Sequence, residues 1–354
     1  MWKWFIPLAA GIAIAVGVAA IGAQQSSSVH VGSTTRSGTT GTSTGTGPVG
    51  LKSTCGSLTG PPTTYDHVIW IWMSDESYTD EIGARGALYT NQLANQCGLA
   101  TNYAAITHPD VPNEVAALSG GTQGLTRQGC APCTTAAASL LSQVGGSWKV
   151  YVQGMRTPCQ RTASGFYLPL SNPATFFTSS NCAAHDVPMG TPGGKGLATD
   201  LASGKLPRFS ILVPDVCDSG SGLVHRYPRC GQSKRVFEVA RSDSWLQHWI
   251  GTIEKSPAYQ SGKTVVIVTW DQGSAPSKKS QLPQVGLNCL SEKKLAGGCW
   301  VATMVVSPYV HPHTWVKTRF SHYSLLRTTE ELLGIHVYLG AAHNAQSMRQ
   351  AFGL

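Results

Sequence analysis

Carboxylates stand within a few residues of the ends of three apolar runs of this sequence, in a pattern that could assemble a metal-binding site. They are Asp75 after His67–Met73, Asp215 and Asp218 after Phe209–Val213, and Asp271 after Thr264–Trp270. Converging carboxylates repel one another unless a cation lies between them, so this pattern indicates a divalent metal ion. The alternative is that these residues only cap turns and helices at the ends of strands.

The apolar runs themselves predict strands that are buried on both faces of a parallel sheet. The expected strands are His67–Met73, Lys149–Val152, Phe209–Val213, Thr264–Trp270 and Ala302–Val306. Helical periodicity occurs over Leu88–Ala94, Ala136–Val144, Val236–Ile253 and Tyr323–Leu333. This alternation predicts an α/β fold, a doubly wound, mostly parallel sheet with helices on both faces. Ligands of such sheets bind beyond the carboxyl ends of the strands, where the carboxylates stand.

Five segments between residues 65 and 353 carry a resemblance to a known family. They are HVIWIWMSDESY (67–78), THPDVPNEVAALSG (107–120), LPRFSILVPDVCD (206–218), VVIVTWDQG (265–273) and SHYSLLRTTEELLGI (321–335). In this order they resemble segments of the bacterial phosphoesterase family, which includes phospholipase C and acid phosphatase enzymes. The resemblance implies an alkaline-phosphatase-like fold and a phosphate-ester substrate.

The resemblance implies a metal site that departs from the family pattern. Family members bind metal through a Glu-Asn pair in the first turn, where this chain has Ser74 and Asp75. A family Asp-Glu pair after the fourth strand is here Asp271 and Gln272. We expect these four positions to hold a divalent metal ion of unknown identity.

The resemblance also implies catalytic positions. The serine nucleophile that follows His-Pro in the family is here Asp110, which could be a metal ligand or a carboxylate nucleophile. Asn113 matches an Asn that can donate to a phosphoryl oxygen. His322 matches the His that opens the last helix, and His225 stands for a His in the loop after Pro-Asp-x-Cys.

Two functions fit these substitutions. One is an exported, metal-dependent hydrolase of phosphate esters with an altered active site. The other is a catalytically inactive envelope or binding protein that keeps the phosphoesterase fold. Three carboxylates, Asp75, Asp110 and Asp271, remain available to balance a divalent cation.

The amino-terminal 64 residues predict export. Residues 1–23 contain an apolar stretch from Phe5 to Ala23, which is expected to be a signal sequence or a membrane anchor. Residues 24–64 begin with a Ser/Thr/Gly-rich stretch that cannot bury a core, so they are expected to be a tether. Residues 65–354 then form the phosphoesterase-like domain. An extracytoplasmic protein follows, with possible membrane attachment through residues 5–23.

Cysteine usage points to the same compartment. All ten cysteines follow the low-complexity stretch, and an even number in an exported chain indicates disulfides. The expected local pairs are Cys217 with Cys230 and Cys289 with Cys299. Cys130 and Cys133 form a C-x-x-C motif, for which a redox or zinc role stays open.

The net charge of +8 suits an anionic partner such as a phosphate ester. Lys and Arg are not gathered into a run that would form a basic patch, so no nucleic acid partner is expected.

Overall fold

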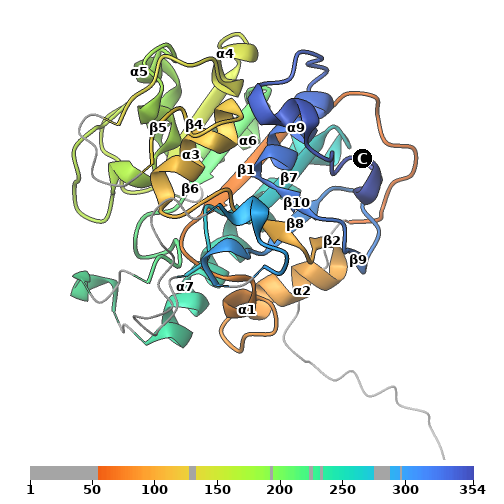
Figure 1. Cartoon of the computed structure of the whole chain (residues 1–354), viewed down its shortest axis with the longest axis horizontal. Helices are drawn as coiled ribbons and strands as arrows, with labels where there is room; N and C mark the ends of the chain where they lie inside the picture. Colours follow the sequence, from red (N-terminus) through yellow and green to blue (C-terminus); the bar gives the residue numbers. More distant parts are fainter. Residues whose placement is uncertain are drawn as a thin grey trace, which may run out of the picture. The chain divides into compact units, whose positions relative to one another are not determined.

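An eight-stranded sheet lies at the centre of the protein, with the strand order β5-β4-β6-β1-β7-β8-β2-β9 (Figure 1). The computed structural model describes residues 55–126, 133–191, 194–222, 226–231, 234–274, 288–295 and 297–354, all within the unit Gly50–Leu354. Five adjacent strands are parallel, namely β5 (Asp186–Pro188), β4 (Trp148–Val152), β6 (Phe209–Val213), β1 (His67–Met73) and β7 (Thr264–Trp270). The predicted α/β class and mostly parallel sheet are confirmed.

The other edge of the sheet changes direction. β8 (Thr303–Val306) runs antiparallel to both β7 and β2 (Gly98–Ala100), and β9 (Thr314–Val316) completes the edge parallel to β2. A separate pair, β3 (Tyr103–Ala104) and β10 (Phe320–Ser321), is parallel. The parallel half therefore has the carboxyl ends of β4, β6, β1 and β7 along one edge.

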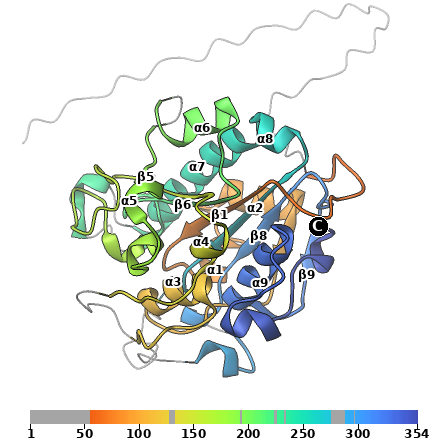
Figure 2. The same cartoon turned by 90° about the horizontal axis from the view of Figure 1, so that it is seen from above.

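Helices cover both faces of the sheet (Figure 2). On one face α7 (Arg235–Glu254) packs against α2 (Leu88–Gln96), α6 (Leu197–Ser203) and α8 (Pro257–Gln260). On the other face α3 (Asp110–Ser119) packs against α4 (Leu140–Gln143) and α9 (His322–Leu332). Two one-turn helices, α1 (Tyr78–Glu81) and α5 (Cys182–His185), lie in the connections.

The central strands are buried because neither face of the sheet is left to solvent. Every residue of β7 is buried, and Trp70 of β1 is 1% exposed. The indole N–H of Trp70 donates to Thr329 Oγ1 of α9 at 2.9 Å, so even the polar edge of this ring has a partner. Continuous apolar strands of this kind fix the turns at their carboxyl ends.

The folded region begins before the expected boundary at residue 65. Cys55 forms a disulfide with Cys97, and the backbone N–H of Leu58 donates to Pro308 O at 2.9 Å. Arg349 Nη2 also donates to Thr63 O at 2.6 Å. Residues 55–64 thus belong to the packed domain, since cysteine and arginine contacts hold a segment that has little apolar surface of its own. Residues 1–54 lie outside the described residues.

Disulfides cross-link the described chain at four places. Both expected pairs, Cys217–Cys230 and Cys289–Cys299, are present, together with Cys55–Cys97 and Cys159–Cys182. Cys133 is also disulfide-bonded, whereas Cys130 lies outside the described residues. Among the residues that the structure describes, none of the helices has the length and apolar character needed to span a membrane. The apolar stretch 5–23 lies outside that part of the chain.

Candidate active site

A cleft of about 430 Å³ opens at the carboxyl edge of the parallel strands. Its floor includes Ser74 and Asp75, directly after β1, and Gln272, which follows β7 by two residues. Asp110, the first residue of α3, lines the same cleft. Segments that are far apart in the sequence therefore meet at the place where a doubly wound sheet binds its ligand.

Three carboxylates converge here. Asp75, Asp110 and Asp271 each offer an oxygen atom, and these atoms all lie within 4.8 Å of one another. Asp75 has φ 57°, a left-handed conformation that Asp tolerates better than most residues. Its backbone N–H donates to Asp271 Oδ1 at 2.9 Å, and Ser74 Oγ donates to Asp271 Oδ2 at 3.1 Å. The turn after β1 is thus built around the Asp271 carboxylate.

Gln272 links the other two acids. Its Nε2 donates to Asp75 Oδ1 at 2.6 Å and also to Asp110 Oδ1. The backbone N–H of Gln272 donates to Asp271 Oδ1 at 2.6 Å. A neutral amide therefore holds two carboxylates together where the family pattern has an acid.

A fourth carboxyl, that of Glu114, lies one helical turn after Asp110 on α3. It is 1% exposed, and the Trp72 indole lies near its carboxyl as a hydrogen-bond donor that lowers its pKa, without a closer bond to either oxygen among the described residues. The position is a Tyr in the family segment, and only the i, i+4 spacing from Asp110 could have marked it in the sequence. A buried carboxyl with so little hydrogen bonding fits a site that accepts a cation.

The electrostatics of this cluster follow from burial and repulsion. Burial, followed by the charges of Asp110 and Asp271, raises the pKa of Asp75 well above its usual value. Burial and the neighbouring acids Asp110 and Glu114 do the same to the pKa of Asp271. The pKa of Glu114 is likewise raised, chiefly by burial. In the described part of the chain, Asp75, Glu114 and Asp271 take part in no ion pair. All the candidate ligand atoms are oxygen atoms, and the cluster has more acidic than basic groups. Both properties fit a hard divalent cation.

Asn113 is close to the cleft but faces the loop before α3. Its Oδ1 accepts from the backbone N–H groups of Ile106 (2.9 Å) and Thr107 (3.1 Å). Its Nδ2 donates to the carbonyls of Thr107 (2.9 Å) and Pro109 (3.1 Å). This differs from the expected contact with a phosphoryl oxygen, because both amide hydrogens are already used. In this structure Asn113 fixes the loop that carries Asp110.

His322 supports Asp271 from behind and does not line the cleft. Its Nε2 lies 2.7 Å from the carbonyl oxygen of Asp271 and must donate, so Nδ1 accepts from Tyr103 OH at 3.1 Å. Complete burial lowers the pKa of His322 to about 4, and the ring is neutral at pH 7. His225 lies outside the described residues.

The carboxylates that follow β6 do not join the cluster. Asp215 accepts from the backbone N–H of Cys217 at 3.0 Å, and Asp218 accepts from Gln153 Nε2 at 2.7 Å. Asp215 caps the turn, as the alternative interpretation of strand-end acids holds, whereas Asp218 binds the side chain of Gln153. The cleft instead contains His108 and Arg226, which the sequence analysis did not single out. Burial lowers the pKa of His108.

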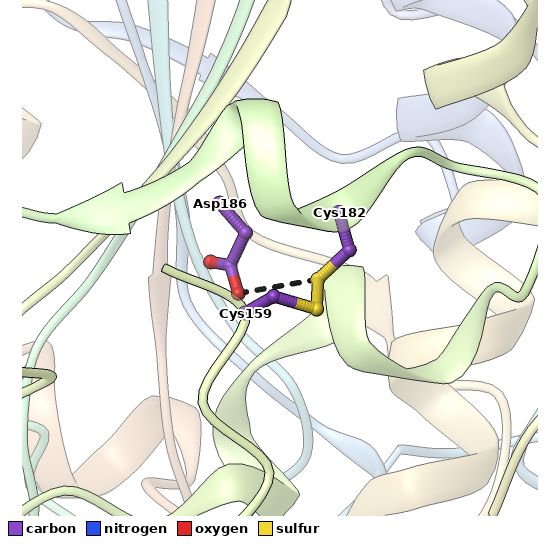
Figure 3. Close-up of side chains that lie close together, drawn as sticks. All are labelled: Cys159, Cys182 and Asp186. Atoms are coloured by element: carbon purple, nitrogen blue, oxygen red, sulfur yellow. Dashed lines mark hydrogen bonds between the residues drawn. A yellow bond between two sulfur atoms is a disulfide. The ribbon is translucent and has the colours of Figure 1, made fainter. Parts of the chain in front are cut away.

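A second group of residue types that can bind metal consists of Cys159, Cys182 of α5 and Asp186 of β5 (Figure 3). Asp186 Oδ2 lies 3.6 Å from Cys182 Sγ, but Cys182 is bonded to Cys159. Sulfur atoms in a disulfide are not thiolates, so this group is not a thiolate metal site while the bond is intact. The acidic cleft is therefore the better candidate for a metal ion.

Comparison with known proteins shows which family the chain belongs to. The model of the Phosphoesterase family matches residues 81–336, which is most of the chain. The chain belongs to the Phosphoesterase family. It is 23% identical over 300 residues to a phosphatidylinositol-3-phosphatase of Mycobacterium tuberculosis, covering 82% of this chain and 84% of that protein. It is 21% identical to an acid phosphatase of Aspergillus fumigatus, covering 77% of this chain but only 55% of the relative.

Solved structures show the same fold. A protein of the alkaline phosphatase superfamily from Vibrio parahaemolyticus aligns with a TM-score of 0.55 at 12% identity, over 84% of this chain and 73% of that one. The lipoteichoic acid synthase LtaP of Listeria monocytogenes aligns at 0.50 and 14% identity, over 81% and 76% of the two chains. The alkaline-phosphatase-like fold is confirmed. Family membership, with phosphatases among the relatives, supports a phosphoester hydrolase.

Proposed function

We propose that this protein is an exported, metal-dependent hydrolase of phosphate esters whose active site is the acidic cleft. The observation that carries the proposal is the meeting of Asp75, Asp110 and Asp271, from three distant segments, within 4.8 Å. Such a cluster is costly in a buried site unless a cation balances it. Asp75 and Asp271 would hold the cation, with Glu114 adding negative charge nearby. A bound divalent cation would polarise the phosphoryl group and offset its repulsion from the acids.

Asp110 is the proposed nucleophile. It lines the cleft and stands at the position of the family's Ser nucleophile. One Asp110 oxygen would bond to phosphorus while the ester P–O bond breaks, and the electron pair of that bond leaves with the ester oxygen. His108, which lines the cleft, would protonate that oxygen. Water would then attack phosphorus and give a proton to His108, while the bond between phosphorus and the Asp110 oxygen breaks and releases phosphate.

Export is part of the proposal. Cytosolic proteins rarely keep disulfides, and the described part of this domain contains four with known partners. The apolar stretch 5–23 would then serve as the signal or anchor.

The Gln272 amide favours a second candidate, an inactive protein of the same fold. The Gln272 Nε2 hydrogen bonds hold Asp75 and Asp110 together, so the two acids can lie side by side without a cation between them. A single set of variants separates the two functions.

The experiment measures turnover of an aryl phosphate ester by wild type, Asp110→Asn, Asp110→Ser and Gln272→Glu, with added zinc, calcium, magnesium or manganese. Asp110→Asn should reduce turnover at least a hundredfold if Asp110 is the nucleophile. An inert wild type that becomes active as Asp110→Ser or Gln272→Glu would establish the inactive alternative and refute the proposal.

A further inference from the structure

A second cavity of about 550 Å³ adjoins the acidic cleft. Arg226 and Tyr227 line both, so they form a shared wall. The second cavity is also lined by Arg156 and Arg229, together with Phe166 and other residues. We call the three arginines and their cavity the arginine annex. It is the basic counterpart of a cleft whose own floor is acidic.

The charges of the annex are available to a ligand. Arg156, Arg226 and Arg229 are all exposed, and none of them forms an ion pair with a carboxylate in the part of the chain that the structure describes. A guanidinium group stays protonated at any pH of interest and binds phosphate through two parallel N–H groups. Three such groups around one cavity select a dianion.

The fold holds the annex against the cleft. The disulfide Cys217–Cys230 ties the segment that carries Arg226 and Arg229 to the turn after β6. Arg241 strengthens this tie, because its Nη1 donates to Cys230 O at 2.7 Å and its Nε to Cys217 O at 3.0 Å. Val216 and Ser219 of the same turn line the acidic cleft. The same disulfide-linked segment therefore contributes residues to both the annex and the cleft.

An aromatic contact forms the back of the annex. The rings of Phe166 and Tyr227 lie edge to face, with centroids 6.3 Å apart. The backbone N–H of Val216 donates to Phe166 O at 3.1 Å, which joins this ring pair to the β6 turn. An apolar wall beside the arginines lowers their hydration and favours a ligand with carbon atoms between its charges.

We propose that the arginine annex binds a second anionic group of the substrate, so that this enzyme prefers phosphate esters that carry a second phosphate. This inference rests on the proposed function of the cleft. A phosphoryl group alone meets mainly carboxylates there, whereas a second phosphate in the annex would gain attraction from Arg156, Arg226 and Arg229. Soluble bisphosphates and lipid headgroups with two phosphates share this chemistry.

The test compares propane-1,3-diol monophosphate with the corresponding bisphosphate. The variant is Arg156→Gln/Arg229→Gln, because these two arginines line the annex and not the cleft. The expected result is a fall of at least tenfold in the ratio of kcat/KM for bisphosphate over monophosphate, mainly through KM. Lys205→Gln is the matched control, since Lys205 is an exposed cation that precedes β6, at the opposite edge of the sheet. Its ratio should stay within twofold of wild type.

Binding of propane-1,3-bisphosphonate, measured by calorimetry, separates this inference from the proposed function. If neither ester is hydrolysed but the bisphosphonate binds at least tenfold more weakly to the double variant, the annex stands and the hydrolase proposal fails. If the double variant changes neither the ratio nor the bisphosphonate affinity, the annex proposal is overturned. Vesicles of phosphatidylcholine with or without phosphatidylinositol 3-phosphate identify the source. If the vesicle lipid is hydrolysed and this turnover depends on Arg156 and Arg229, the second phosphate belongs to a lipid headgroup. If only the soluble bisphosphate is hydrolysed, the substrate is a free bisphosphate.

Discussion

Asp271→Asn is the sharpest perturbation of the acidic cleft, because it removes charge and keeps shape. Oδ1 of Asp271 accepts two backbone N–H groups, and an Asn oxygen can accept the same two. Oδ2 accepts from Ser74 Oγ, and an Asn amide can donate to that hydroxyl instead. The local hydrogen bonds can therefore survive in the variant while one hard anionic ligand is lost.

The magnitude follows from the 4.8 Å limit on the distances between the three acids. Two unit charges at that distance repel by about 3.5 kcal/mol at an effective dielectric constant near 20. Because the raised pKa values keep part of the cluster protonated, we expect the cation-free variant to gain roughly 1 to 3 kcal/mol over wild type. A cation at a hundred times its Kd stabilises wild type by about 2.7 kcal/mol, and a tenfold weaker Kd removes about 1.4 kcal/mol of that.

Thermal unfolding with and without added cation measures both effects. Wild type should rise in Tm by about 5 °C at saturating cation. The Tm of Asp271→Asn should be higher than that of wild type without cation, and it should increase less when cation is added. Asp66→Asn is the control, because Asp66 is an exposed acid at the opposite end of β1, paired with Lys263 at 3.6 Å. Absence of cation-dependent stabilisation in wild type, with zinc, calcium, magnesium and manganese all tried, would refute the metal site. An equal rise in wild type and Asp271→Asn would refute the role of Asp271.

Two further predictions concern buried carboxyls. Glu114→Gln should weaken cation binding, because it removes an acid that can ionise beside a bound cation. It should also raise the Tm of the cation-free protein, because one acid fewer shares the negative charge of the buried cluster, and an unchanged Tm with and without cation would contradict this. Burial raises the pKa of Asp186 to about 7 and so favours its protonated form, although Asn172 Nδ2, which donates to Oδ2 at 2.9 Å, acts in the opposite direction. Since the unfolded pKa is about 3.9, wild type loses stability as the pH rises from about 4 through 7, by up to about 4 kcal/mol. In urea unfolding, the free energy of unfolding of Asp186→Asn should therefore increase relative to that of wild type between pH 5 and pH 8. An equal difference in the free energy of unfolding at the two pH values would show that Asp186 does not titrate in this range.

The strands of the parallel half could be predicted closely from sequence. β1, β6 and β7 begin and end at the predicted residues, because a continuous apolar run with β-branched residues has few other stable states in water. The direction of β8 is not encoded in its apolar run, which reads the same in either orientation. The helix expected over Ala136–Val144 shrinks to Leu140–Gln143, since Ser139 and Ser142 form a capping box that starts the helix there.

The positions of site residues that directly follow strands could be predicted from the sequence. The positions of residues that depend on the path of a loop could not. Asp75 and Asp271 meet because their strands are adjacent in the sheet. Whether Asn113 faces a ligand or its own loop depends on the backbone path of residues 106–109, which no periodicity specifies. The arginine annex depends on a disulfide and on ring contacts between segments some sixty residues apart, such as Phe166 and Tyr227.

The disulfide between Cys55 and Cys97 has a mechanical consequence. It closes a covalent loop with a sequence separation of 42 residues, which contains β1 and the turn with Ser74 and Asp75. Tension applied to the amino terminus enters the described fold at Cys55 and passes through the sulfur bond to Cys97. The backbone of β1 lies off this load path. An enzyme held at a surface by its amino terminus would thus be pulled by shear flow without strain on the strand that positions Ser74 and Asp75.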